Sequence, residues 1–171
     1  MKLSKILFSV SLIASSVFAS EFIDYSKLSK SLKEEAKKTG NYATTEEVKK
    51  ALTQKDWAVV DVRTAEEWAA GFIKGTQRVG REAPEKALEN VVLDDEDKFV
   101  KDNLIVVCNT ASRAAIEAET FRKMGFKTVK IYDMHKWIDE CNPVSTKYSD
   151  AEDKTGTKNK FGAYYAEHCK K

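Results

Sequence analysis

Cys108 and the residues that follow it carry the clearest chemical signal in the chain. Residues 104–107 read Leu-Ile-Val-Val, and three of these four side chains are β-branched, which is typical of a strand buried on both faces. Cys108 ends this run, small or polar residues follow it, and Arg113 opens an Ala- and Glu-rich segment that favours a helix. Loop amides and the positive end of a helix both stabilise an anion on sulfur. The pattern predicts a nucleophilic thiol; the alternative is a small buried side chain at a strand end.

The elements that must position Cys108 alternate between strands and helices. The predicted strands are residues 57–62, 76–79, 104–108 and 127–132. The predicted helices are residues 21–38, 45–52, 64–71, 81–90, 94–100, 112–124 and 134–140. This alternation predicts an α/β fold with a mostly parallel central sheet flanked by helices on both faces. Ligands of such sheets bind at the carboxyl ends of the strands, which is where Cys108 falls.

The two ends of the chain differ from its middle. The chain has 171 residues, which is the length of one well-buried domain. Residues 1–19 combine a basic start, an apolar run and a small residue at the expected cleavage position, so they predict a signal peptide and an exported, periplasmic protein. Residues 20–42 form a predicted N-terminal helical extension, residues 43–144 the domain, and residues 145–171 a polar C-terminal extension.

Charge argues against two classes of partner. The whole chain has 29 Lys and Arg against 27 Asp and Glu, and removal of Lys2 and Lys5 with the signal peptide makes the two totals equal at 27. Charges of both signs are interspersed along the chain. We therefore expect no nucleic-acid-binding groove, and no membrane association after signal cleavage.

Three separate motifs, in the expected order, resemble the rhodanese-like domain family of sulfurtransferases. Asp61-Val62-Arg63-Thr64, with Glu67-Trp68 and residues 71–76, resembles the first signature of that family. Residues 108–113 resemble its active-site loop, and residues 133–137 with Asn142-Pro143 resemble its closing motif. The resemblance covers residues 43–144, and three motifs in register are more specific than any one of them. Phe72 stands where the family has histidine, Ala111 stands where its loop has glycine, and the usual glycine pair before the closing tryptophan is absent.

The resemblance implies a role for each motif residue. A persulfide forms on Cys108 from a donor of the thiosulfate or polysulfide class, and a thiophilic acceptor then takes the sulfur. The persulfide-binding loop comprises Asn109, Thr110, Ala111, Ser112 and Arg113. Arg81 is a candidate contact for the anionic donor, and the structural set is Asp61, Arg63 and Glu67. The four-residue spacing of Arg63 and Glu67 predicts an ion pair between them.

The loop also bears on alternative functions. Its six residues are one fewer than in the related cysteine phosphatases, which favours a sulfur atom over a phosphate. Ala111 and the shortage of cations in the loop leave open a rhodanese-like module that binds without turnover. We expect no cofactor and no metal. The expected partners are a small sulfur-containing anion, a thiol acceptor and a candidate partner protein.

Cys141 and Cys169 are the other two cysteines of the chain. In an exported protein they predict a disulfide, which leaves Cys108 as the free thiol. A second hypothesis makes one of them the redox partner of Cys108. A metal site that uses both with His168 is a weaker alternative, because the spacing of these ligands is scattered.

Overall fold

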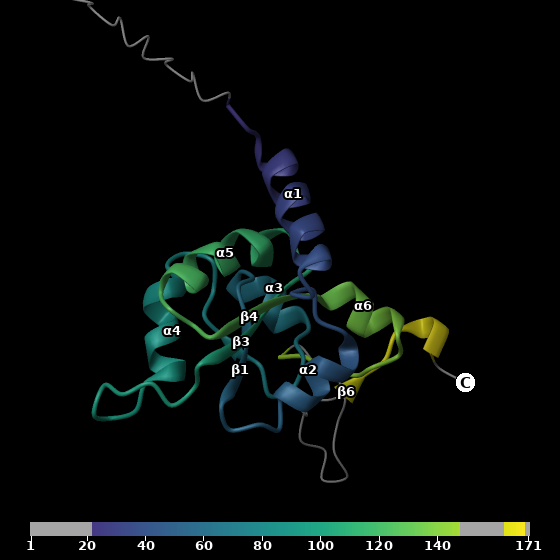
Figure 1. The fold of residues 1–171 in the computed structure, drawn as a ribbon. Helices are drawn as coiled ribbons and strands as arrows, with labels where there is room; N and C mark the ends of the chain where they lie inside the picture. Colours follow the sequence, from purple (N-terminus) through teal and green to yellow (C-terminus); the bar gives the residue numbers. More distant parts are fainter. Residues whose placement is uncertain (1–21, 148–162, 170–171) are drawn as a thin grey trace, which may run out of the picture.

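A computed structural model describes residues 22–147 and 163–169 (Figure 1). The predicted signal peptide, residues 1–19, lies outside the described residues. Among the described residues, no helix combines the length and the apolar character that crossing a bilayer requires.

The central sheet has four parallel strands in the order β2-β1-β3-β4. These strands are β1 (Trp57–Asp61), β2 (Gln77–Arg78), β3 (Asn103–Cys108) and β4 (Thr128–Asp133). Strand β3 is buried along its whole length because it lies between β1 and β4 and is covered on both faces. Its register places Cys108 beside Asp133 at the carboxyl end of the sheet. The predicted parallel sheet and the predicted position of Cys108 are confirmed.

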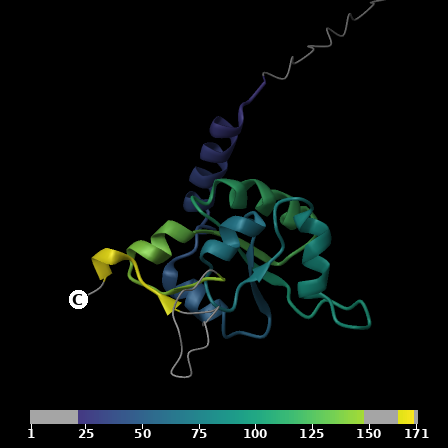
Figure 2. The ribbon, with the colours of Figure 1, turned by 180° about the vertical axis from the view of Figure 1, so that it is seen from behind.

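Helices cover both faces of this sheet (Figures 1 and 2). On one face lie α1 (Tyr25–Lys38), α4 (Pro84–Val92) and α5 (Ser112–Lys123), which share a core with the side chains of Val60, Leu104 and Val106. On the other face lie α2 (Thr45–Ala51) and α6 (Met134–Asp139), which pack on Val59, Ile105 and Val107. The alternation along β3 of side chains that enter the two cores follows from the two-residue period of a strand.

The short helix α3 (Ala65–Ala70) follows β1 and begins with a capping box. The Thr64 hydroxyl accepts the Glu67 backbone N–H, and the Glu67 carboxylate accepts the Thr64 backbone N–H. The same arrangement between Thr44 and Glu47 begins α2. Both boxes satisfy amide donors that a helix start leaves unpaired, so the two helices begin at defined residues.

The helix predicted at residues 94–100 is wrong. The Asp94 carboxylate instead accepts the backbone N–H groups of Glu96 and Lys98, and Asp97 has a positive φ of 57°. An antiparallel bridge between Leu93 and Phe99 closes this turn. Side-chain-to-backbone bonding by an aspartate competes with helix formation, which explains the difference.

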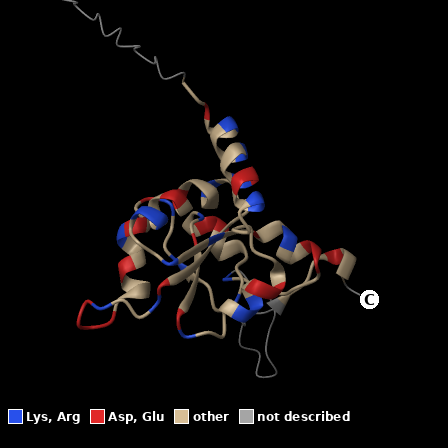
Figure 3. Cartoon of the chain, in the orientation of Figure 1, with Lys and Arg blue, Asp and Glu red and all other residues tan. Residues whose placement is uncertain are grey.

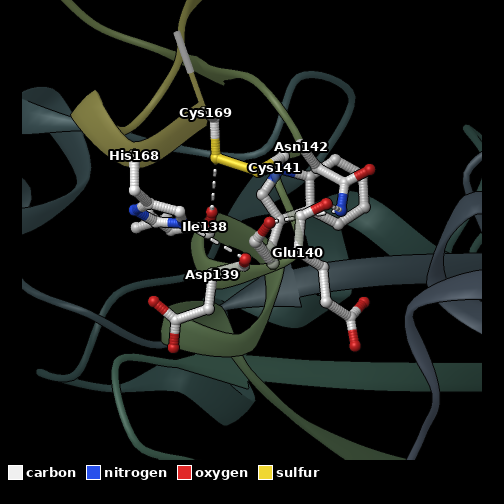
Figure 4. Close-up of a disulfide and its surroundings, with 8 residues drawn as sticks. Ile138, Asp139, Glu140, Cys141, Asn142, His168 and Cys169 are labelled. Atoms are coloured by element: carbon white, nitrogen blue, oxygen red, sulfur yellow. Dashed lines mark hydrogen bonds between the residues drawn. A yellow bond between two sulfur atoms is a disulfide. The ribbon is translucent and has the colours of Figure 1, made fainter. Parts of the chain in front are cut away.

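The C-terminal part of the chain folds back onto the domain. Strand β5 (Val144–Ser145) pairs antiparallel with β6 (Ala163–Tyr164), and the 3₁₀ turn η1 (Glu167–Cys169) follows. A disulfide joins Cys141, just after α6, to Cys169 (Figure 4). The pairing expected from the sequence is therefore present, and Cys108 is the free cysteine. Positions of Lys or Arg and positions of Asp or Glu are interspersed along the helices (Figure 3).

Candidate active site

The thiol of Cys108 lies at the start of α5, where the sheet ends. Cys108 is only 1% exposed, and its Sγ accepts the backbone N–H of Ala114 at 3.4 Å. This amide belongs to the first turn of α5, which has no partner for its N–H groups within the helix. The sequence predicted that amides of the loop, residues 109–113, stabilise an anion on the sulfur; the hydrogen bond observed comes from the next residue, Ala114. A negative charge on Sγ is favoured by the same amide and by the helix dipole.

Ala111 takes the backbone conformation for which the family uses glycine. Its φ is 59° and its ψ is 3°, so it lies in the left-handed region as the N-cap of α5. An L-residue pays roughly 1–2 kcal/mol for this conformation. Its methyl group is fully buried in the core, which offsets part of that cost. The loop therefore adopts this left-handed conformation with alanine in place of glycine.

Glu67 lies in α3, which follows β1, and its carboxylate holds the loop in place. Its carboxylate accepts Nη1 and Nη2 of Arg113 at 2.6 and 2.9 Å, and Nδ2 of Asn109 at 2.8 Å. The Arg113 hydrogen bonds and the Thr64 amide lower the pKa of the Glu67 carboxyl from 4.5 to about 2, against the opposing effect of burial. Glu67 in turn raises the pKa of the Arg113 guanidinium, and so does the Cys108 thiolate. The two ends of the loop are thus clamped to one carboxylate.

Asp61 and Arg63 form a second, fully buried pair beneath the loop. Arg63 Nη2 lies 2.6 Å from Asp61 Oδ2, and Arg63 Nη1 donates to Asn109 Oδ1 at 3.1 Å. The predicted ion pair between Arg63 and Glu67 is therefore wrong. The Arg63 side chain folds back onto Asp61, while the capping box turns the Glu67 carboxylate toward Arg113. Arg63 reaches only the backbone oxygen of Glu67.

Lys33 is a loop contact that sequence reasoning missed. From α1, its Nζ donates to Ser112 Oγ at 3.0 Å and to the Thr110 carbonyl at 3.4 Å. No pattern in the sequence distinguishes Lys33 from the other lysines of the same amphipathic helix. Arg81, the cation proposed from the sequence, has an exposed side chain, and its backbone N–H bonds to Glu82. The structure brings Lys33, not Arg81, into hydrogen-bond contact with the loop.

Tyr42 was not singled out from the sequence. It forms an isolated parallel bridge with Ile131 of β4 and packs against the core under α5. Burial, the Asp133 carboxylate and the Cys108 thiolate together raise the pKa of the Tyr42 phenol to about 12. At neutral pH this side chain is therefore uncharged.

A model of the rhodanese-like domain family matches residues 44–139 of this chain. The match includes β1, β3, the loop and α5, and so covers the whole of the Glu67 clamp. The chain belongs to the rhodanese-like domain family.

Solved structures of other proteins are similar to this chain. The polysulfide-sulfur transferase homodimer of Wolinella succinogenes is 26% identical in sequence, with a TM-score of 0.51, over 76% of this chain and 98% of that chain. A protein of unknown function from Rhodopseudomonas palustris, described as a possible tyrosine phosphatase, is 22% identical with a TM-score of 0.45, over 66% and 89% of the two chains. A protein from Bacillus halodurans is 23% identical with a TM-score of 0.42, over 68% and 85%. No curated protein matches the chain.

Within residues 22–147 and 163–169, one further group of potential ligands joins the end of α6 to the C-terminal extension. Donor atoms of Cys141, His168 and Cys169 lie within 4.8 Å of one another (Figure 4). Both sulfurs are bonded to each other in the disulfide, so neither is a thiolate ligand in this state. Neither sulfur is bonded to Cys108, whose thiol is free.

Proposed function

We propose that this chain is a sulfurtransferase that carries sulfane sulfur as a persulfide on Cys108. The observation that carries the proposal is the Cys108 thiol, placed on the Ala114 amide at the start of α5 inside a loop clamped by Glu67. A terminal sulfur added to Sγ stays anionic, and amides with a helix dipole stabilise such a charge. Membership of the rhodanese-like family supports this function.

The transfer is a displacement in two steps. The Cys108 thiolate attacks the outer sulfur of thiosulfate, a new S–S bond forms, and the old bond to the sulfonate sulfur breaks with its electron pair. The products are the Cys108 persulfide anion and sulfite. With a polysulfide the leaving group is the polysulfide shortened by one sulfur. A thiophilic acceptor, such as cyanide or a thiolate, then attacks the outer sulfur and regenerates the Cys108 thiolate.

Two features support a donor class and a compartment for this reaction. The Wolinella succinogenes relative is named a polysulfide-sulfur transferase, which supports polysulfide as well as thiosulfate as donor. The disulfide between Cys141 and Cys169 supports an oxidising compartment outside the cytosol, in line with the proposed export to the periplasm. The proposed partners are a small sulfur-containing anion and a thiol acceptor.

Intact mass of the purified protein after exposure to thiosulfate or polysulfide tests the function. We expect the mass to increase by one sulfur atom, cyanide to remove it, and Cys108→Ser to acquire none. A wild-type protein that gains no sulfur from either donor, while its Cys108 is readily alkylated, would instead identify a rhodanese-like module that binds without turnover.

A further inference from the structure

We propose that Lys33, from the helix that precedes the family match, binds the anionic end of the sulfur donor. This inference rests on the proposed sulfurtransferase function and assigns it a preference for anionic donors. The loop that Lys33 contacts lies within the residues that the family model matches, whereas Lys33 lies before them, in the N-terminal extension. Lys33 is thus a binding residue that the family motifs do not include.

The charges around the loop single out Lys33. The Arg113 guanidinium is paired with Glu67, and Arg63 is paired with Asp61, so each of these cations is neutralised by a carboxylate. Within the described part of the chain, the Lys33 ammonium has no carboxylate within ion-pair distance; its partners are a hydroxyl and a carbonyl. Lys33 therefore brings a net positive charge to the loop.

The chemistry needs such a charge. Thiosulfate and polysulfides are anions, and the nucleophile that they must approach is itself a thiolate. Asp133 lies directly beside Cys108 in the sheet register and adds a further carboxylate at this edge. Repulsion between like charges slows the encounter, and a fixed cation near the path raises the local concentration of an anion.

The packing of α1 fixes where this cation lies. Leu32 and Ala36 of α1 pack into the core that α5 also covers, and these residues flank Lys33 in the sequence. Figure 1 shows the C-terminal half of α1 against the body of the domain and its N-terminal half projecting from it. An ammonium group has three N–H donors, and the bonds to Ser112 Oγ and the Thr110 carbonyl use two of them. The third is left for a ligand at the half-exposed side of the loop.

Sulfur loading of Cys108 by two donors of different charge tests the inference. We expect Lys33→Met to slow loading by thiosulfate about fivefold to tenfold, the size of one charge-assisted hydrogen bond at a partly exposed site. With diallyl trisulfide, a neutral donor, the Cys108 thiolate takes an allylthio or allyldithio group and releases allyl persulfide or allyl thiolate, and the rate of this reaction should change less than twofold. Lys33→Arg keeps the charge and should retain most of the thiosulfate rate. Lys30→Met, an exposed lysine of the same helix, is the matched control and should load at the wild-type rate with both donors.

Equal slowing with both donors would overturn the inference, because it would show that Lys33 only holds the loop in place. An unchanged thiosulfate rate in Lys33→Met would overturn it as well. Alkylation of Cys108 separates these failures from failure of the proposed function, since it requires no sulfur transfer. We expect Lys33→Met to lower the rate with iodoacetate relative to neutral iodoacetamide by about threefold or more. If Lys33→Met changes this ratio but the wild type takes sulfur from no donor, the sulfurtransferase function is refuted and Lys33 remains an anion-binding residue. An unchanged ratio would refute the Lys33 site itself.

Discussion

Replacement of Glu67 by glutamine tests the clamp on which the loop geometry depends. The lowering of the Glu67 pKa from 4.5 to about 2 corresponds to about 3 kcal/mol of preference for the ionised form in the folded protein. The side chains of Arg113 and Glu67 are 22% and 32% exposed, and solvent screening reduces this to about 1–2 kcal/mol. Glutamine still fits the capping box with Thr64. We therefore expect Glu67→Gln to lower the thermal midpoint by about 3–6 °C at neutral pH.

The pH dependence of this difference provides the sharper test. A carboxyl with a depressed pKa in the folded state contributes stability that is fully present above its unfolded pKa and is lost as pH falls through its folded value. For Glu67 the loss begins near the unfolded value of 4.5 and is complete near 2. Calorimetric scans of wild type and Glu67→Gln should differ by a constant amount from pH 7 to 5 and converge below that. Glu89→Gln, at an exposed position of α4, controls for the loss of one charge. Equal midpoints for Glu67→Gln and wild type at pH 7, or a gap that persists undiminished at pH 3, would refute the clamp.

Two other substitutions test features of the loop and of the tail. Ala111→Gly relieves roughly 1 kcal/mol of left-handed backbone strain, but it removes a buried methyl group and adds freedom to the unfolded chain, so we expect a net stability change under about 1 kcal/mol in urea titration. Ala111→Val should destabilise by more than about 2 kcal/mol, because a β-branched side chain is strained at positive φ and overfills the core; a stable valine variant would contradict the loop conformation. Removal of the disulfide by Cys141→Ser with Cys169→Ser should cost about 2–4 kcal/mol, given that the two cysteines are 28 positions apart in the sequence. Dithiothreitol should then destabilise the wild type and leave the double variant unchanged, and equal sensitivity of the two proteins would argue against a disulfide.

The sequence predicted the strands and helices that position the site, because these elements depend on local residue patterns. The apolar run that ends at Cys108 predicted β3, and the helices predicted at residues 45–52 and 64–71 begin within one residue of α2 and α3. The turn after Asp94 was not predicted, because its charged residues are equally compatible with a helix until side-chain bonding is known.

Contacts between segments distant in the sequence were not predicted for a different reason. Helical spacing suggested that Glu67 pairs with Arg63, four residues away, whereas its partner is Arg113, 46 residues away. Lys33 and the Ser112 hydroxyl are 79 residues apart. A periodic pattern shows which face of an element is buried, but it does not show which charged side chain of another element lies opposite.

The charges around the loop come partly from the family motifs and partly from the N-terminal extension. Arg113 belongs to the loop, but its charge is balanced by Glu67, which belongs to the first signature. The charges of Arg113 and Glu67 therefore nearly cancel at the loop where a ligand would bind. Lys33, which has no carboxylate partner among the residues that the structure describes, comes from residues before the family match. A chain with the same loop but another N-terminal extension would keep the nucleophile and lose this charge. The preference for a charged or a neutral sulfur donor is therefore expected to vary with the extension, even where all three family motifs are the same.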